Sequence, residues 1–147
     1  MSAPIELNPE NFKETIDKPG VVFIDWWAPW CGPCRYTLPN LARWQAAYKS
    51  KGLVILGLTK YYGQGGGKQL KPAEELVYLR DFRMGHKLPY GFVVEDGEKN
   101  EFNYGVFSIP TSFLIDRKGV VRYISLGASE DEIALLGRLI DKLMEEK

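Results

Sequence analysis

The sequence predicts an α/β fold in which one mixed β-sheet is flanked by helices. Along most of the chain, short apolar runs rich in β-branched residues alternate with longer segments of helical periodicity. Near the C-terminus, two further strand patterns flank a tight turn at Arg117-Lys118-Gly119. Strands that alternate with helices form α/β sheets, and the late hairpin supplies an antiparallel part. The length of 147 residues suits a single domain over residues 1–147.

The charge balance and hydropathy argue against two classes of partner. The 19 Lys and Arg residues offset 19 Asp and Glu residues, so nothing favours electrostatic capture of nucleic acid or of an anionic membrane surface. No apolar run approaches the ~20 residues that span a bilayer. The N-terminus has neither the basic nor the apolar region of a signal peptide. A cytoplasmic protein and a mature or excised domain both stay open.

The first half of the chain predicts two helices and two strands. Residues 8–18 begin with a capping asparagine and a proline, which indicates a short helix. Residues 21–26 form an apolar run, which predicts a central strand buried on both faces. A long helix follows the second cysteine and ends near residue 51, where a glycine stops it. Residues 53–58 are the next strand.

A glycine-rich segment, residues 63–68, superficially suggests a phosphate-binding loop. Its leading glycine is misplaced for that motif, and Gln69 stands where the motif requires Ser or Thr. The segment is therefore predicted to be a flexible loop.

The second half follows the same alternation and ends in a hairpin and a helix. The predicted elements are a helix over 72–84, a strand over 90–94, a helical turn over 100–104 and strands over 111–116 and 120–125. Gly85 is the expected cap of the first of these helices. Ser129 and Glu132 match a capping box, which opens the last helix.

The two cysteines, Cys31 and Cys34, stand between a strand and a helix. A helix N-terminus offers unpaired N–H groups and partial positive charge, which favour a thiolate over a thiol. A disulfide across two intervening residues constrains little unfolded chain. A structural zinc site usually needs four Cys or His ligands, and the chain has only one histidine, His86. The pair is therefore predicted to be redox-active, with no metal site.

The run Asp25-Trp26-Trp27-Ala28-Pro29-Trp30-Cys31-Gly32-Pro33-Cys34 resembles the thioredoxin active site. Ile109-Pro110-Thr111 resembles the second thioredoxin hallmark, the cis-proline loop. The longer segment between the two motifs is similar to that of the TlpA/ResA-like branch of thiol-disulfide oxidoreductases. The resemblance implies a thioredoxin fold with an insertion over roughly residues 61–103.

Three residues are the catalytic candidates. Cys31, nearer the exposed start of the helix, is expected to attack a substrate disulfide, and Cys34 to resolve the mixed disulfide. Asp25 is an acid in an otherwise apolar strand, and the resemblance implies that it moves the Cys34 proton. The alternative for Asp25 is an exposed cap of the following loop. Thioredoxins usually place a lysine near this acid, whereas residues 54–58 are wholly apolar here.

Five further residues are expected to contact the substrate. Trp30 is predicted to be a partly exposed wall of the groove, while the neighbouring Trp27 belongs to the core. Gly32 and Pro33, between the cysteines, resemble those of reducing thioredoxins. The resemblance implies that the Ile109 backbone pairs with the substrate and that Pro110 follows a cis peptide bond.

The predicted function is protein-disulfide reduction through the Cys31–Cys34 pair, with no other cofactor. The resemblance implies a disulfide-containing protein substrate, an upstream electron donor (thioredoxin or a membrane thiol shuttle) and a periplasmic or membrane-anchored location. A monomer is the default. The alternative is a copper-delivery module that binds Cu(I) through the two cysteines with Met84 and His86. Glu95 and Asp96 are either acids near the active site or an ordinary turn.

Overall fold

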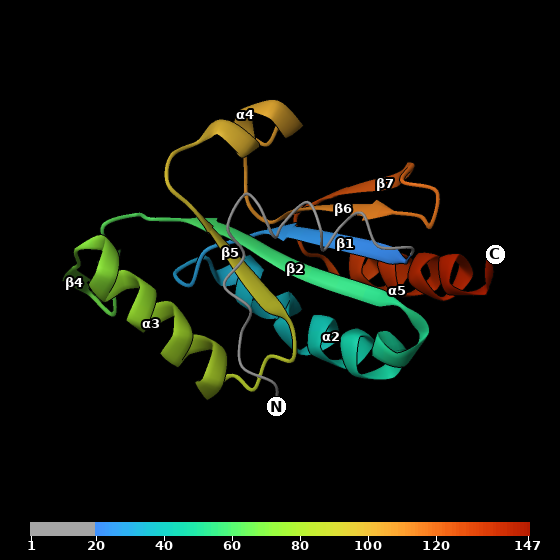
Figure 1. Ribbon diagram of the computed structural model, residues 1–147, viewed down its shortest axis with the longest axis horizontal. Coiled ribbons are helices and arrows are strands. Elements are labelled where there is room, and N and C mark those ends of the chain that lie inside the picture. The colour runs from blue at the N-terminus through green and yellow to red at the C-terminus, as the bar shows by residue number, and fades with distance from the viewer. Residues whose placement is uncertain (1–19) are drawn as a thin grey trace.

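A five-stranded mixed sheet forms the centre of the computed structural model, which describes residues 20–147 (Figure 1). Its strands, in the order β5-β2-β1-β6-β7, are Gly91–Glu95, Leu53–Lys60, Val21–Trp26, Thr111–Ile115 and Val121–Leu126. Strands β5, β2 and β1 run parallel, whereas β6 is antiparallel to both β1 and β7. The predicted mixed α/β sheet and its late hairpin are confirmed. The helix predicted over residues 8–18 lies outside the described residues.

Strand β1 is the central strand and is buried along its whole length. Its side chains alternate between two apolar clusters, as the period of a strand requires. Phe23 belongs to the larger cluster, together with both cysteines, and Ile24 belongs to the smaller cluster on the opposite face. Asp25 therefore points toward the face that carries the cysteines.

Helices α2 (Gly32–Tyr48), α3 (Pro72–Gly85) and α5 (Glu130–Glu145) contribute side chains to the larger cluster. Helix α2 passes into a 3₁₀ turn, Lys49–Lys51, and ends at Gly52, whose φ of 95° favours glycine. The short helix α4 (Lys99–Tyr104) lies on the other side of the sheet in Figure 1, where Tyr104 packs against the smaller cluster. None of the helices within residues 20–147 combines the length and apolarity needed to cross a membrane.

The glycine-rich segment contains two short paired strands, so the prediction that it is a loop throughout is wrong. Residues Gln64–Gly65 (β3) and Lys68–Gln69 (β4) pair as an antiparallel hairpin. Gly66 and Gly67 turn the chain with φ values of 59° and 78°, a conformation that other residues rarely adopt. A further small correction concerns α3, which includes Gly85 as its last residue and has His86 as its C-cap.

The predicted capping box of α5 is half formed. The Ser129 hydroxyl accepts a hydrogen bond from the Glu132 N–H at 3.1 Å. The Glu132 carboxylate accepts hydrogen bonds from the hydroxyls of Tyr123 and Ser125 on β7, at 2.7 and 2.8 Å. These contacts fasten the start of α5 to the edge of the sheet.

Candidate redox-active site

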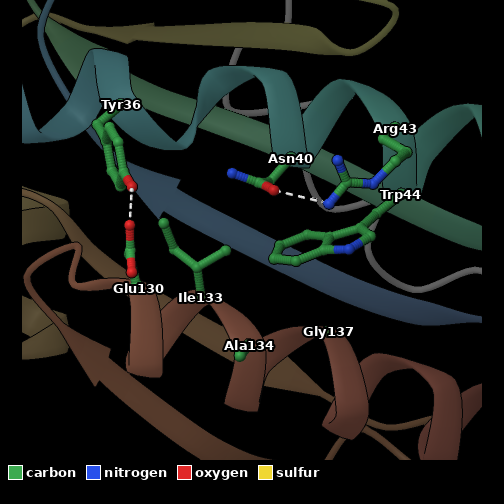
Figure 2. A pocket seen from close by; sticks show the side chains of 8 residues that line it. All are labelled: Tyr36, Asn40, Arg43, Trp44, Glu130, Ile133, Ala134 and Gly137. Carbon is green, nitrogen blue, oxygen red and sulfur yellow. Dashed lines mark hydrogen bonds between the residues drawn. The ribbon is translucent and has the colours of Figure 1, made fainter.

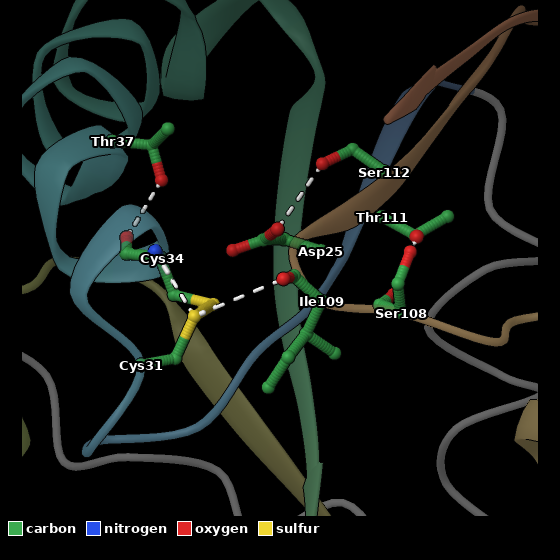
Figure 3. The surroundings of a disulfide bond; sticks show 8 residues. All are labelled: Asp25, Cys31, Cys34, Thr37, Ser108, Ile109, Thr111 and Ser112. Carbon is green, nitrogen blue, oxygen red and sulfur yellow. Dashed lines mark hydrogen bonds between the residues drawn. A yellow bond between two sulfur atoms is a disulfide. The ribbon is translucent and has the colours of Figure 1, made fainter. Parts of the chain in front are cut away.

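Cys31 and Cys34 form a disulfide at the N-terminus of α2, with their Cα atoms 5.2 Å apart (Figure 3). Cys31 is the N-cap residue, and its Sγ accepts the Cys34 N–H at 3.2 Å. Cys34 is fully buried, and Cys31 retains 5% of its exposure. The helix N-terminus and this N–H both stabilise negative charge on the Cys31 sulfur. The geometry makes Cys31 the sulfur within reach of a substrate.

The Ile109–Pro110 peptide bond is cis, as predicted. The Ile109 carbonyl oxygen lies 4.0 Å from the Cys31 Sγ. The Thr111 hydroxyl donates to the Ser108 carbonyl at 2.6 Å and closes the loop around the proline. Figure 3 shows the Ile109 carbonyl directed at the disulfide. Backbone far away in the sequence is thus brought beside Cys31.

Asp25 is 2% exposed, so the prediction of an exposed cap is wrong and the prediction of a buried acid is confirmed. One carboxyl oxygen accepts the Ser112 hydroxyl at 3.1 Å, and the other has no hydrogen-bond partner. Burial raises the pKa of Asp25 from 3.8 to about 7, against a smaller lowering by Ser112. In Figure 3 the unpartnered oxygen points toward Cys34.

No lysine pairs with Asp25 in the described part of the chain. Gly57 of β2 and Ser112 of β6 are its neighbours across the sheet. The ammonium group of Lys60 instead binds the carboxylates of Glu98 and Glu101, at 2.7 and 3.2 Å. Among residues 20–147, no nearby cation therefore offsets the desolvation of Asp25.

Exposed apolar and small residues stand within two positions of Cys31 or Ile109 in the sequence. Trp30 is 54% exposed and Phe107 is 94% exposed. Gly32 and Pro33, between the cysteines, are also exposed. Trp27, by contrast, is 1% exposed and belongs to the core, as predicted. Exposed aromatic side chains so close in the sequence to the reactive cysteine and to the cis-proline loop suit contact with another polypeptide.

A network from the inserted segment supports Trp30. The Trp30 ring meets the Tyr62 ring edge-on, with centroids 5.2 Å apart. The Lys60 ammonium lies over the Tyr62 ring, 5.2 Å from its centroid. Glu75 of α3, only 3% exposed, accepts the backbone N–H groups of Tyr62 and Gly63 at 2.8 and 2.9 Å. Glu75 therefore fixes the loop that carries Tyr62.

His86, considered for a metal site, and Glu95, considered as an extra acid, have other contacts. His86 stacks on Phe82 with centroids 4.0 Å apart, and Met84 is 63% exposed. Glu95 accepts the Asn100 N–H at 2.7 Å, so it holds the start of α4, as an ordinary turn residue does. Within residues 20–147 no group of three or more His, Cys, Asp or Glu side chains is arranged to hold a metal ion.

A hollow of about 350 Å³ lies between α2 and α5 (Figure 2), and neither cysteine lines it. Its polar lining groups are paired with one another. Arg43 donates to the Asn40 side chain at 2.7 Å, and Tyr36 donates to Glu130 at 3.5 Å. None of the predicted site residues lines it.

Four residues at or near the site were not predicted from the sequence: Ser112, Tyr62, Glu75 and Phe107. Ser112 meets Asp25 only through the register of β1 and β6, which local patterns do not specify. Glu75 looks like any acid in the first turn of a helix. Of the four, only Phe107 could have been noticed in the sequence, since it stands three residues before the proline of the second motif.

Known proteins with similar sequences are named as thioredoxins or as thiol-disulfide oxidoreductases. The thioredoxin family model matches residues 3–60. The thiol-disulfide oxidoreductase ResA of Bacillus thuringiensis (strain Al Hakam) is 32% identical over 101 residues, 68% of this chain and 51% of ResA. The thioredoxin-like protein YneN of Bacillus subtilis is 28% identical over 106 residues, 72% of this chain and 56% of YneN. This chain therefore aligns with only about half the length of these two relatives.

Solved structures extend the similarity over most of the chain. A Chlorobium tepidum structure named as a thiol:disulfide interchange protein, DsbE, has 30% sequence identity and a TM-score of 0.66. The match covers 89% of this chain and 84% of that one. StoA of Bacillus subtilis, at 22% identity and a TM-score of 0.63, shares the fold, with 82% of each chain covered. On this evidence the chain belongs to the thioredoxin-like family of thiol-disulfide oxidoreductases.

Proposed function

We propose that this chain is a protein-disulfide reductase in which Cys31 and Cys34 cycle between dithiol and disulfide. One observation carries the proposal: a disulfide at a helix N-terminus lies beside the cis Ile109–Pro110 bond, on the sheet face to which the buried Asp25 points. The two sulfurs carry the electrons, so the reaction needs no other cofactor.

The reaction proceeds in two exchanges. The Cys31 thiolate attacks one sulfur of a substrate disulfide, so that a Cys31–substrate disulfide forms and one substrate thiolate leaves. The Cys34 thiolate then attacks the Cys31 sulfur and releases the second substrate thiolate. The substrate gains two electrons, and the chain ends as the Cys31–Cys34 disulfide. A dithiol donor restores the reduced pair by the reverse exchanges.

Asp25 accepts the Cys34 proton before the second exchange. A carboxyl whose pKa is about 7 is divided between acid and carboxylate at neutral pH, which is the property a general base requires. Because Cys34 is fully buried, bulk water does not reach its thiol, and a base inside the protein is needed.

The exposed aromatic side chains of Trp30 and Phe107 favour a protein as the disulfide-bearing substrate. The Ile109 carbonyl is positioned to accept a hydrogen bond from the backbone of that substrate. The Gly32-Pro33 dipeptide and Ile109 resemble reducing members of the family and support the reducing direction. We further infer a monomer, a thioredoxin or membrane thiol shuttle as donor, and an extracytoplasmic site of action, on the strength of the TlpA/ResA-like resemblance.

The proposed function is tested by assaying both the reduction of a protein disulfide and the formation of one. The chain is expected to accelerate the reduction of insulin by dithiothreitol, and the Cys31→Ser variant to give only the background rate. It is expected to be a poor catalyst of disulfide formation in reduced ribonuclease. Efficient oxidation of ribonuclease with slow reduction of insulin would contradict the reducing direction.

Substitution of Glu75 by glutamine is expected to weaken substrate binding. A glutamine amide provides one acceptor where the carboxylate now serves two N–H groups, so the Tyr62 loop loses a charge-assisted hydrogen bond worth about 1–3 kcal/mol. Since Tyr62 supports Trp30, the KM for insulin should rise about threefold to tenfold, with little change in kcat. Steady-state kinetics and the near-UV circular dichroism of the aromatic pair measure this effect.

Glu74→Gln is the matched control, because Glu74 is the exposed neighbour and glutamine retains its capping contact with the Lys71 N–H. The role assigned to Glu75 is wrong if Glu75→Gln alters the near-UV spectrum of the aromatic pair but leaves the KM at its wild-type value.

A further inference from the structure

Two buried polar groups that lack a hydrogen-bond partner within residues 20–147 stand only two residues apart in the sequence. One is a donor, the indole N–H of Trp27, whose side chain is 1% exposed. The other is an acceptor, the second carboxyl oxygen of Asp25, since Ser112 donates to the first. A buried polar group without a partner costs free energy, so an unused donor and an unused acceptor this close call for a reason.

Gly57 of β2 is the residue through which the structure relates the two groups. Gly57 pairs with Asp25 in the register of β1 and β2. A Cβ built on Gly57 would lie 2.8 Å from the Trp27 Nε1. Because neighbouring strands are about 4.8 Å apart, the indole nitrogen lies within about 8 Å of the Asp25 Cβ. The N–H therefore occupies the space beside Asp25 that a side chain on Gly57 would fill.

The Trp27 ring is held in this place from several sides. Its backbone N–H donates to the Leu58 carbonyl at 2.9 Å. Its ring packs against Phe92 and Phe82, with centroids 4.6 and 5.3 Å apart. Phe92 is the partner of Gly57 on β5 and would lie 3.1 Å from the same Cβ position. The indole edge is thus kept at Gly57 by its packing.

The free Asp25 oxygen is on the side away from Ser112. Ser112 pairs with Asp25 from β6, whereas Gly57 pairs with it from β2 on the opposite side of β1. In Figure 3 the free oxygen points away from Ser112 and toward Cys34. A carboxylate oxygen has two lone pairs, so it can accept from the indole N–H and still face the Cys34 sulfur.

The other titratable groups around Asp25 offer little stabilisation to a carboxylate. Those buried in the elements that pack on this face are Cys31, Cys34, Glu75, Arg83 and Tyr90. The two cysteines are neutral in the disulfide, and Glu75 and Arg83 bind backbone groups of other residues. Burial holds the pKa of Tyr90 well above its usual value, so Tyr90 is uncharged. Besides Ser112, the indole N–H is the donor that strand pairing places beside Asp25 in the described part of the chain.

We propose that Trp27 is a positioning residue for the redox site, whose indole N–H donates to the free Asp25 oxygen when that carboxyl ionises. The last torsion of an aspartate side chain is soft, so the oxygen turns toward the N–H at little cost. The bond supplies the stabilisation that a lysine near the acid would otherwise give. The consequence for Cys34 rests on the proposed function: a carboxylate held in this way accepts the Cys34 proton.

The indole N–H resonances of the oxidised chain test this contact without any change at Trp27. In ¹H–¹⁵N NMR spectra recorded from pH 5 to pH 9, the Trp27 indole proton is expected to move downfield at the midpoint of the Asp25 carboxyl, because a charge-assisted hydrogen bond forms. Asp25→Asn should abolish this movement. The Trp26 indole N–H is the internal control, since it is also buried and unpartnered within residues 20–147 but lies in the smaller cluster on the opposite face.

The Trp27→Phe variant removes the donor. Asp25 should then titrate about one pH unit higher in the oxidised chain, a tenfold change in its ionisation constant. The titration is followed by NMR of ¹³C-carboxyl-labelled aspartate, with Asp25→Asn to identify the resonance. Trp26→Phe is the matched control, because it removes a buried indole from the other face of the sheet and should leave the Asp25 midpoint unchanged.

A Trp27 indole resonance that does not follow the Asp25 carboxyl would overturn the inference. An Asp25 midpoint that is unchanged or lowered in Trp27→Phe, or raised equally in Trp26→Phe, would overturn it too. If Trp27→Phe does not fold, the indole titration of the wild-type chain decides alone. Neither titration needs a substrate, so coupled titration in a chain that fails to reduce insulin would support the contact and contradict only the proposed function.

Discussion

Replacement of Cys34 by serine is expected to trap the chain on its substrate through Cys31. A serine hydroxyl does not displace a thiolate from a disulfide, so the second exchange stops after the first has occurred. Cys31 keeps its place at the N-terminus of α2 and is expected to attack as before. Insulin reduction should fall to the uncatalysed rate, while a covalent adduct accumulates toward one substrate per chain.

Mass spectrometry of the adduct, before and after reduction, checks this outcome. Cys31→Ser is the matched control and should form no adduct, because Cys34 is fully buried. An adduct that forms through Cys34 in the Cys31→Ser variant would reverse the roles of the two sulfurs. The absence of an adduct in Cys34→Ser with any disulfide substrate would remove Cys31 as the nucleophile.

Replacement of Asp25 by asparagine is expected to stabilise the fold at high pH and to slow the second exchange. Below about pH 3 the carboxyl is protonated in both the folded and the unfolded chain. Between pH 4 and 7 the unfolded chain, with a pKa of 3.8, loses the proton that the folded chain, with a pKa of about 7, retains. The folded state then binds more protons, so wild-type stability falls as the pH rises.

The difference in free energy of unfolding between Asp25→Asn and wild type should therefore be small at pH 4, where the unfolded carboxyl is only partly ionised. It should rise to at most about 4 kcal/mol above pH 7, since each pKa unit is worth about 1.4 kcal/mol. Urea unfolding of the oxidised chain at pH 4, 6 and 8 measures it. Asp81→Asn, a change of an exposed carboxyl on α3, is the control and should show no such rise.

The kinetic effect of Asp25→Asn tests the role of Asp25 as a base, separately from the effect of its burial on the free energy of unfolding. Attack by Cys31 should be little changed, whereas release of substrate from the Cys31 adduct should slow near neutral pH, because the Cys34 proton has lost its acceptor. Stopped-flow kinetics resolves the two steps. Equal slowing of both steps would contradict the assignment of Asp25 to Cys34.

The parts of the site that come from one continuous stretch could be predicted from the sequence. The apolar run 21–26 and the residues after it specify β1, the turn and the start of α2, so both cysteines stand where the local pattern indicates. A lone acid within that buried run predicts the burial of Asp25. The cis bond at Pro110 followed from family resemblance, because isolated residues around a proline do not specify the isomer.

The parts that depend on distant pairing could not be predicted. Ser112 and Gly57 become neighbours of Asp25 only when three strands adopt one register. The glycine-rich segment has no strand pattern, and its hairpin forms against α3, where a Cβ on Gly65 would lie 2.7 Å from the Tyr78 ring. Glu75 is buried because the chain returns over it, which no local signal in α3 indicates.

The reduction potential of the Cys31–Cys34 couple is the most direct test of the central claim that the chain reduces protein disulfides. It is measured by equilibrating the protein with defined mixtures of thiol and disulfide and quantifying the reduced fraction. A potential near that of thioredoxin, about −270 mV, is expected. A potential near that of DsbA, about −120 mV, would contradict the account, because the chain would then donate its disulfide to substrates.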